Sequence, residues 1–364
     1  MRYIDASQLR PGMQLADNLY SLGSGQMIMP RGTVLDDKLI SRLEMYPTSR
    51  ISIQEGLWEP TKEPASPDLP PSYAQRLRQT PEFQQFKSDF EETFSSFKWS
   101  INEIVKQDSD ISDKKVSEMA EPVFHLITAT TGPSHLFDML HCLRQYDDET
   151  YAHSVNVALI AHSIGVWMNL PEEDLNVLTK AGLMHDIGKL MVPHNIISKP
   201  ASLTSDEYNI IKEHTLHGYE ILKVQNIDER IKLAVLEHHE RCDGSGYPNH
   251  LVGKDIDPFA KVIALADVYD AVTSPRVYRD AQCPFIALSI IENEGMQKYD
   301  SSAYLSFMSN VVNIYLLNQV RLNDGRKGEI VFINREFFSK PTIRIGNEYI
   351  DLSLNPQLYI EELL

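Results

Sequence analysis

The sequence predicts a mainly α-helical protein: a helical bundle that follows a small β-rich domain and precedes a short β appendage. Apolar residues recur at helical spacing through the middle of the chain, as in the phenylalanines from Phe83 onward, which share one helix face. Turn-forming Pro and Gly residues divide residues 1–56 into short apolar runs. Near the C-terminus, residues 329–333 and 342–345 have the composition of strands.

These changes in texture divide the chain into five segments. Five prolines between Pro60 and Ser72 exclude a helix there and indicate a semi-extended linker. The segments are 1–56 (a β-rich accessory or regulatory domain with a helix at 36–45 and a strand at 51–53), 57–80 (the Pro-rich linker), 81–145 (a helical connecting segment), 146–320 (a His-rich helical domain) and 321–364 (a β-hairpin appendage). Beyond the phenylalanine-rich helix that begins at Pro81, helices are expected at 112–129, 133–145, 149–168, 172–187, 205–223, 228–239, 258–274, 284–295 and 301–319.

Composition excludes several classes of protein. The formal net charge of −17 argues against a general nucleic-acid coat, and hence against a DNA partner, because such proteins hold phosphates through a basic surface. No apolar stretch approaches 18 residues, so no membrane span is expected, and the polar start lacks the apolar core of a signal peptide. Three widely spaced cysteines without a C-x-x-C pair argue against a disulfide framework. We therefore expect a cytoplasmic protein.

The histidines are concentrated in the helical domain. Nine of the twelve fall between His153 and His250, where an even spread would place far fewer. Imidazoles and carboxylates are the usual ligands of catalytic metals, so this clustering indicates a metal site. Glu149 and His153 are four residues apart and share a helix face, although on their own they also fit a charged surface pair.

The pair His185–Asp186 follows an apolar helical run, which places a carboxylate at a buried helix end. Such a charge is costly unless a metal or hydrogen bonds compensate it. Gly188 can end the helix, and Lys189 then lies ready to meet an anion. The alternative is an ordinary helix C-terminus with a basic residue on the helix dipole, which leaves the His–Asp pair unexplained.

Two further helical segments add candidate ligands. His214 and His217 are three residues apart, so both could be ligands, but we expect His214 to bind metal and His217 to lie behind it or at the surface. His238 and His239 end a helix and point about 100° apart, so both are ligands only where two metals lie side by side.

After these two histidines comes a turn rich in glycine. Gly244 and Gly246 let the backbone approach a ligand closely, Tyr247 offers a ring and a hydroxyl, and Pro248 stiffens the exit. A purely structural turn is the competing interpretation.

A carboxylate on an apolar helix completes the set. Asp267 needs a metal or a base as partner, and Asp270, one turn later, can hydrogen-bond a ligand histidine from behind. Arg276 and Arg279 follow and can form a fork on phosphate oxygens, or else lie at a solvated helix end. The eight candidate metal ligands are Glu149, His153, His185, Asp186, His214, His238, His239 and Asp267. Eight ligands without a cysteine suit two or three Fe or Mn ions.

Residues 145–320 resemble the HD-GYP subgroup of the HD-domain metal-dependent phosphohydrolases. The resemblance is carried by HDIGK at 185–189, His214, HHE at 238–240, DGSGYP at 243–248 and Asp267. Cys242 and Val277 depart from the residues usual at their positions, and neither is a candidate ligand. The resemblance implies an HD-type helical bundle and a bacterial second-messenger phosphodiesterase that hydrolyses cyclic di-GMP to pGpG, GMP or both. Because Glu149 and His153 stand where trinuclear members carry extra ligands, it favours three metals.

The expected reaction is attack on phosphorus by a hydroxide held between two metals. Asp186 would bridge the ions, and Lys189, with Arg276 and Arg279, would neutralise the phosphates. Gly244, Gly246, Tyr247 and Pro248 would form a wall beside the guanine or ribose. Two alternatives stay open: an enzyme for another cyclic nucleotide, such as cyclic GMP-AMP, or a module that binds cyclic di-GMP or a GGDEF-type diguanylate cyclase without turnover. An oligomer is compatible with the sequence.

Overall fold

The computed structural model describes residues 2–4, 9–17, 19–20, 27–29, 31–35, 40, 51–54, 73–107, 111–143, 149–197, 199, 201–275 and 281–364. The chain divides into two compact units, residues 1–70 and 71–364. Each unit has a hydrophobic core of its own. The candidate site residues all belong to the second unit.

The first unit is built from short strands. β1 (Arg2–Ile4) pairs antiparallel with β4 (Ile51–Ile53), and β2 (Leu19–Tyr20) pairs antiparallel with β3 (Met27–Met29). The predicted strand at 51–53 is therefore confirmed. Apart from residue 40, the predicted helix at 36–45 lies outside the described residues, as does most of the predicted linker.

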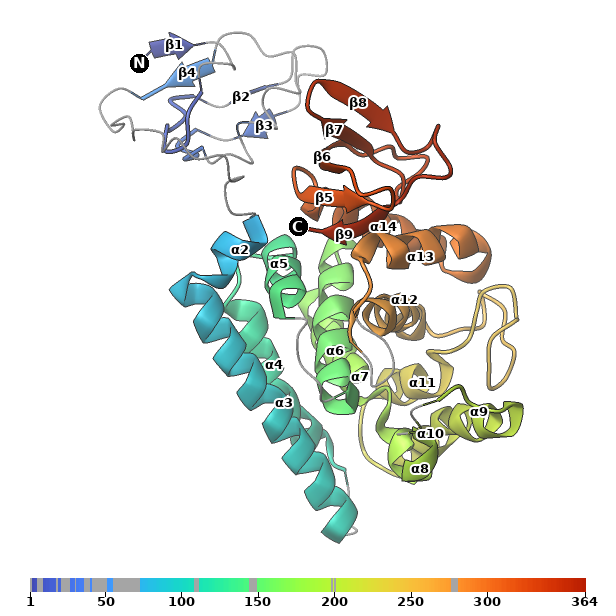
Figure 1. Ribbon diagram of the computed structural model, residues 1–364. Coiled ribbons are helices and arrows are strands. Elements are labelled where there is room, and N and C mark those ends of the chain that lie inside the picture. Colours follow the sequence, from blue (N-terminus) through green and yellow to red (C-terminus); the bar gives the residue numbers. More distant parts are fainter. Residues whose placement is uncertain are drawn as a thin grey trace. The chain divides into compact units, whose positions relative to one another are not determined.

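The second unit is mainly α-helical, which confirms the predicted fold class (Figure 1). Its helices are α2 (Tyr73–Arg78), α3 (Pro81–Gln107), α4 (Asp113–Thr128), α5 (Pro133–Leu143), α6 (Glu149–Trp167), α7 (Glu172–Met184), the 3-10 helix η2 (Ile187–Met191), α8 (His194–Ile197), α9 (Ser205–Lys212), α10 (His214–Lys223), α11 (Glu229–Glu237), α12 (Pro258–Thr273), α13 (Pro284–Lys298) and α14 (Ser301–Ile314). Within the described ranges no helix combines the length and apolarity needed to cross a bilayer.

The structure differs from the sequence prediction at three helix boundaries. α2 lies inside the segment predicted as linker. The helix predicted at 172–187 stops at Met184, and η2 begins at Ile187 after a two-residue break. The helix predicted at 205–223 is two helices, α9 and α10, which meet at Glu213. The last two breaks fall beside candidate metal ligands, so they shape the site.

α6 lies at the centre of the second unit and packs against α3, α5, α7 and α12 (Figure 1). Two glycines permit the close approaches that the site requires. A Cβ on Gly182 of α7 would lie 2.9 Å from Ala158 Cα of α6, and one on Gly188 of η2 would lie 1.8 Å from the carbonyl oxygen of His214. Only glycine lets α7 meet α6, and η2 meet α10, at these distances.

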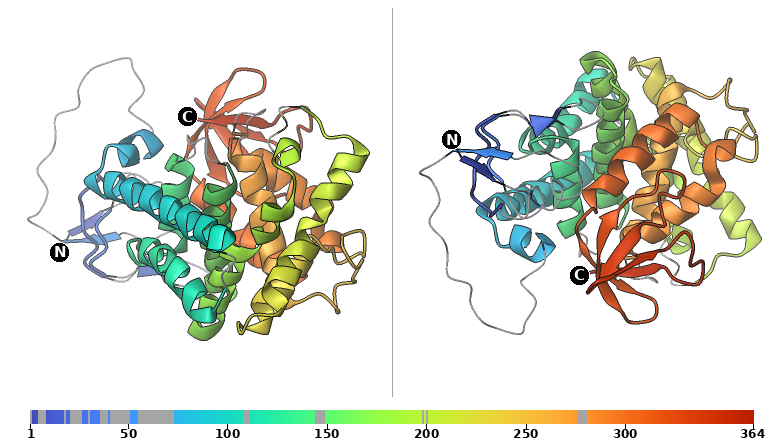
Figure 2. Two further views of the ribbon diagram at one scale, coloured as in Figure 1. Left: turned by 90° about the horizontal axis from the view of Figure 1, so that it is seen from below. Right: turned by 90° about the horizontal axis from the view of Figure 1, so that it is seen from above.

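The C-terminal region is a five-stranded antiparallel sheet, so the predicted hairpin is too small (Figure 2). Its strands, in sheet order, are β8 (Glu348–Asp351), β7 (Thr342–Ile345), β6 (Lys327–Phe332), β5 (Gln319–Leu322) and β9 (Ile360–Leu363). Glu292 of α13 ties the region to the bundle, because its carboxylate accepts the backbone N–H groups of Phe338 and Ser339. β5, β8 and β9 are four residues each and carry charged side chains, which hides their strand pattern.

Candidate metal centre

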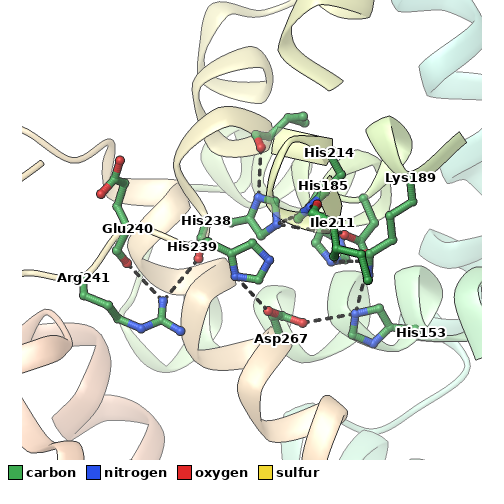
Figure 3. A network of polar contacts seen from close by, with 12 residues as sticks. His153, His185, Lys189, Ile211, His214, His238, His239, Glu240, Arg241 and Asp267 are labelled. Atoms are coloured by element: carbon green, nitrogen blue, oxygen red, sulfur yellow. Dashed lines mark hydrogen bonds and ion pairs between the residues drawn. The ribbon is translucent and has the colours of Figure 1, made fainter. Parts of the chain in front are cut away.

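Five elements bring seven imidazole or carboxylate ligands to one place in the second unit (Figure 3). The ligand candidates are His153 on α6, His185 and Asp186 between α7 and η2, His214 at the start of α10, His238 and His239 at the end of α11, and Asp267 on α12. They form three overlapping groups, and within each group one ligand atom of every residue lies within 4.8 Å of the others. Seven of the eight residues predicted as ligands are thus brought together.

Asp186 lies at the centre of this cluster, and its side chain is only 2% exposed. Its Oδ2 is 3.3 Å from His185 Nε2 and 3.5 Å from His153 Nε2. Its Oδ1 is 3.4 Å from His214 Nε2 and 4.0 Å from His238 Nε2. The two carboxylate oxygens therefore face different histidines, which is the arrangement that a ligand shared between two ions requires.

Three of the histidines are held in the same way. In each, Nδ1–H donates to the backbone carbonyl three residues earlier in the chain. The pairs are His185 with Gly182 (2.7 Å), His214 with Ile211 (2.6 Å) and His238 with Val235 (2.9 Å). A carbonyl can only accept, so Nδ1 carries the proton and Nε2 is left with a lone pair that faces the cluster.

Among the described residues, the unprotonated nitrogens have no hydrogen-bond donor as partner. His214 Nε2 and His238 Nε2 lie 3.2 Å apart, and with both lone pairs turned inward neither can donate to the other. His185 Nε2 and Asp186 Oδ1 are buried without a hydrogen-bond partner. Such groups are costly to bury unless a cation satisfies them. The donor set, imidazole nitrogen and carboxylate oxygen, fits divalent ions of the Fe, Mn or Zn kind.

Burial keeps the cluster in the protonation state that metals require. It lowers the pKa of His214 to about 4 and that of His239 to about 3. Burial alone would raise the pKa of Asp186, but His185 and Lys189 outweigh it and hold that pKa well below its ordinary value. At neutral pH His214 and His239 are therefore neutral and Asp186 is ionised, so a cation that binds these three residues need not displace protons.

His153 lies between two carboxylates, Asp267 on the side of the cluster and Asp270 behind it. His153 Nε2 lies 3.1 Å from Asp267 Oδ1, and His153 Nδ1 donates to Asp270 Oδ2 at 2.7 Å. Ser274 Oγ donates to the other oxygen of Asp270. Asp270 therefore orients the ring of a candidate ligand, the role that the sequence suggested for it.

Lys189 lies beside Asp186 and donates to its Oδ2. Both residues line a cavity of about 260 Å³ whose other walls come from α3, α6, α7, η2 and α8 and include Phe97, Tyr151 and Leu183. The lysine is therefore placed where it can pair with an anion that enters from this cavity.

The glycine-rich turn after His239 is held by a buried carboxylate. Glu240 accepts the N–H groups of Asn249 (2.6 Å) and Leu251 (3.0 Å). Gly244 has φ +78°, and a Cβ on Gly246 would lie 2.4 Å from Glu240 Cα, so the turn folds back tightly on its own start. Sequence reasoning missed this role of Glu240. The signal was present, because a third titratable residue directly after two histidines at a helix end must also find a partner.

Tyr247, in the same turn, packs on a candidate ligand. Its ring stacks on that of His239 with centroids 4.7 Å apart and an interplanar angle of 28°. Pro248 follows it through a cis peptide bond. The Tyr247 ring thus limits the orientation of the His239 ring, whose Nδ1 lies 3.7 Å from Asp267 Oδ2.

Four of the predicted residues are not joined to the cluster by the structure. His217 lies on the outer side of α10, 39% exposed, with Nε2 3.8 Å from Glu213 Oε2. The side chain of Glu149, and the whole of Arg276 and Arg279, lie outside the described residues. Their roles stay predictions.

The part of the chain that contains this site is similar to known proteins. Residues 134–303 match the family model described as HD domain. The chain is 32% identical to the cyclic di-GMP phosphodiesterase PA4108 of Pseudomonas aeruginosa, over 58% of this chain and 51% of that protein. It is 37% identical to the cyclic di-GMP phosphodiesterase response regulator RpfG of Xanthomonas campestris pv. campestris, over 42% of this chain and 41% of that protein.

A third relative carries a different substrate in its name. The chain is 34% identical to the 3'3'-cGAMP-specific phosphodiesterase 2 of Vibrio cholerae, over 41% of this chain and 29% of that protein. The chain thus spans about half the length, or less, of these curated relatives.

Removing the central carboxylate should remove the metal. We expect Asp186→Ala to fall to background metal content, because Asp186 is the residue that faces histidines from three helices. Emission spectroscopy on protein purified without oxygen, with circular dichroism to check the fold, measures this. His217→Ala is the matched control, since His217 is exposed and paired with Glu213, and it should keep the parent's metal. Full metal content in Asp186→Ala would contradict the assignment.

The protein should lose stability in acid through a histidine outside the cluster. His162 Nδ1 donates to Thr179 Oγ1, whose own hydroxyl donates to Leu175, and burial lowers the pKa of His162 to about 4. In the unfolded chain His162 takes up a proton near its ordinary pKa of about 6.5, whereas in the folded chain it stays neutral down to about pH 4. The free energy of unfolding therefore falls as the pH drops below about 6.5.

Relative to His162→Gln, the parent should lose about 2 kcal/mol of unfolding free energy between pH 7 and pH 5. Urea unfolding of both proteins at the two pH values measures this, with the exposed His125→Gln as control. If the difference in unfolding free energy between the parent and His162→Gln is the same at both pH values, His162 does not titrate as described.

Proposed function

We propose that this chain, whose residues 134–303 match the HD domain model, is a metal-dependent phosphodiesterase that hydrolyses cyclic di-GMP to pGpG, GMP or both. The observation that carries the proposal is the set of inward-facing imidazole lone pairs around Asp186, which a cation must satisfy. Relatives named as cyclic di-GMP phosphodiesterases support the substrate.

The ions would be held by two neighbouring sets of ligands. His214, His238 and His239 form one set, and His153, His185 and Asp267 form another, with Asp186 between them. We propose Fe or Mn as the native metal, and a third ion held with the help of Glu149. When bound, such ions act as Lewis acids and lower the pKa of water so that a nucleophile is available at neutral pH.

The chain's own residues would bind and orient the substrate. Lys189 lies in the wall of the cavity and can move its hydrogen bonds from Asp186 to a phosphate oxygen, which offsets the charge that builds up as the phosphodiester is attacked. Arg276 and Arg279 would serve the other phosphate. Tyr247 and the turn from Gly244 to Pro248 would form the wall against which the nucleotide rests.

The rival substrate is another cyclic dinucleotide, since one relative is named for cyclic GMP-AMP. We expect the Fe- or Mn-loaded chain to convert cyclic di-GMP faster than 3'3'-cyclic GMP-AMP or cyclic di-AMP, with pGpG or GMP seen by chromatography, and Asp186→Ala to convert none. Faster turnover of cyclic GMP-AMP would show that it, and not cyclic di-GMP, is the preferred substrate. Tight binding of cyclic di-GMP without product, in metal-loaded protein, would favour the receptor interpretation.

A third ion can be tested by counting metals. Glu149→Ala should hold one ion fewer per chain than the parent while keeping the two ions that the described ligands support, because those ligands are untouched. Metal quantification on both proteins after the same anaerobic loading gives the answer. An unchanged count would refute the trinuclear version and leave a two-metal centre.

A further inference from the structure

Besides the cavity that Asp186 and Lys189 line, the cluster has a second partly exposed side, at His239 and Asp267. His153, His185, Asp186, His214 and His238 are almost fully buried, whereas the side chains of His239 and Asp267 are 19% and 11% exposed. The ring stacked on His239 is that of Tyr247. A substrate that reaches the cluster from this side therefore passes Tyr247 and the residues beside it.

Next to Tyr247 lies one face of α9. Lys212 Nζ is 5.7 Å from the centroid of the Tyr247 ring and 4.8 Å from that of Tyr208. Tyr208 and Lys212 are four residues apart on α9, so they share a face, and that face continues from the stacked pair at the metal site. His214, a candidate ligand, is two residues after Lys212, which fixes α9 relative to the cluster.

The two side chains have the chemistry that binds a nucleotide. Tyr208 is 48% exposed, so much of its ring is available to stack with a base. Within the described part of the chain, the polar side-chain partner of Lys212 is Asn209 Oδ1 at 3.3 Å, and no carboxylate pairs with it. An ammonium without a counter-ion, in a chain of net charge −17, is available for a phosphate.

We propose that Tyr208 and Lys212 form a nucleotide-binding edge beside the metal centre, in which Tyr208 stacks on a purine base and Lys212 pairs with the attached phosphate. The proposal rests on the proposed function for the identity of the substrate, since a cyclic dinucleotide presents both groups. The edge sets affinity for the nucleotide and takes no part in the chemical step.

The test uses two readouts, one of which needs no turnover. Steady-state KM and kcat are measured for cyclic di-GMP, and the Kd of GMP is measured by calorimetry, all on the metal-loaded full chain. Tyr208→Ala should raise both KM and Kd at least about 5-fold, the low end expected for loss of a base–aromatic stack. The value of kcat and the metal content should stay near the parent's.

Matched variants separate stacking from general damage. Tyr208→Phe keeps the ring and should bind like the parent. Tyr359→Ala removes a tyrosine of nearly the same exposure, 47%, from the position before β9 and should change none of these values. Lys212→Ala should raise the Kd of GMP and flatten its dependence on salt, because one ion pair with phosphate is lost.

The inference is overturned if Tyr208→Ala leaves both KM and Kd unchanged, or if its KM and Kd rise only together with loss of metal. These outcomes differ from failure of the proposed function. A parent chain that binds GMP through Tyr208 but does not hydrolyse cyclic di-GMP would keep the nucleotide-binding edge and refute the substrate.

Discussion

The structure depends on one electrostatic constraint: a fully buried carboxylate, Asp186, surrounded by imidazole nitrogens whose lone pairs point at it. Anion and lone pairs repel, and Lys189 can satisfy only one of the two carboxylate oxygens. Leaving such a buried charge without a partner costs several kcal/mol of stability, on the order of 3–5. A cation bound by these groups would replace the repulsion between them with attraction to the cation. The ligand atoms are therefore arranged as a cation would require, and the surrounding helices fix their positions.

The way the histidines are held explains why the site lies where helices end. Carbonyls in the last turn of a helix lack an N–H partner within that helix. His185, His214 and His238 each follow such a turn, in α7, α9 and α11, and each donates Nδ1–H to a carbonyl three residues back. One bond thus satisfies a helix end and fixes the tautomer that leaves Nε2 free. The breaks after Met184 and at Glu213 are part of this arrangement.

Much of this could be predicted from the sequence, and the misses have physical causes. The apolar periodicity locates the helices. The His–Asp and His–His pairs and the other polar residues on apolar helices locate seven of the ligands, because a buried charged or polar side chain is costly without a partner. The break between α9 and α10 could not be predicted, since the apolar pattern of 205–223 continues through Glu213. The five-stranded sheet was underestimated because β9 pairs with β5, some forty residues earlier in the chain, and distant pairing leaves no local signal.

The proposed substrate is an anion and the chain is strongly acidic, so the source of their attraction needs an explanation. Exposed charges beyond a Debye length, about 8 Å at physiological salt, are largely screened, so the overall −17 has little influence within the site. What a phosphate meets there is local: the ions, Lys189 on the cavity side and Lys212 beside Tyr247. The two lysines lie in different surroundings, one paired with Asp186 and one without a carboxylate partner in the described chain. The proposed cyclic dinucleotide, with two phosphates and two bases, would suit this division better than a single small anion, because it could engage Lys189 and Lys212 at once.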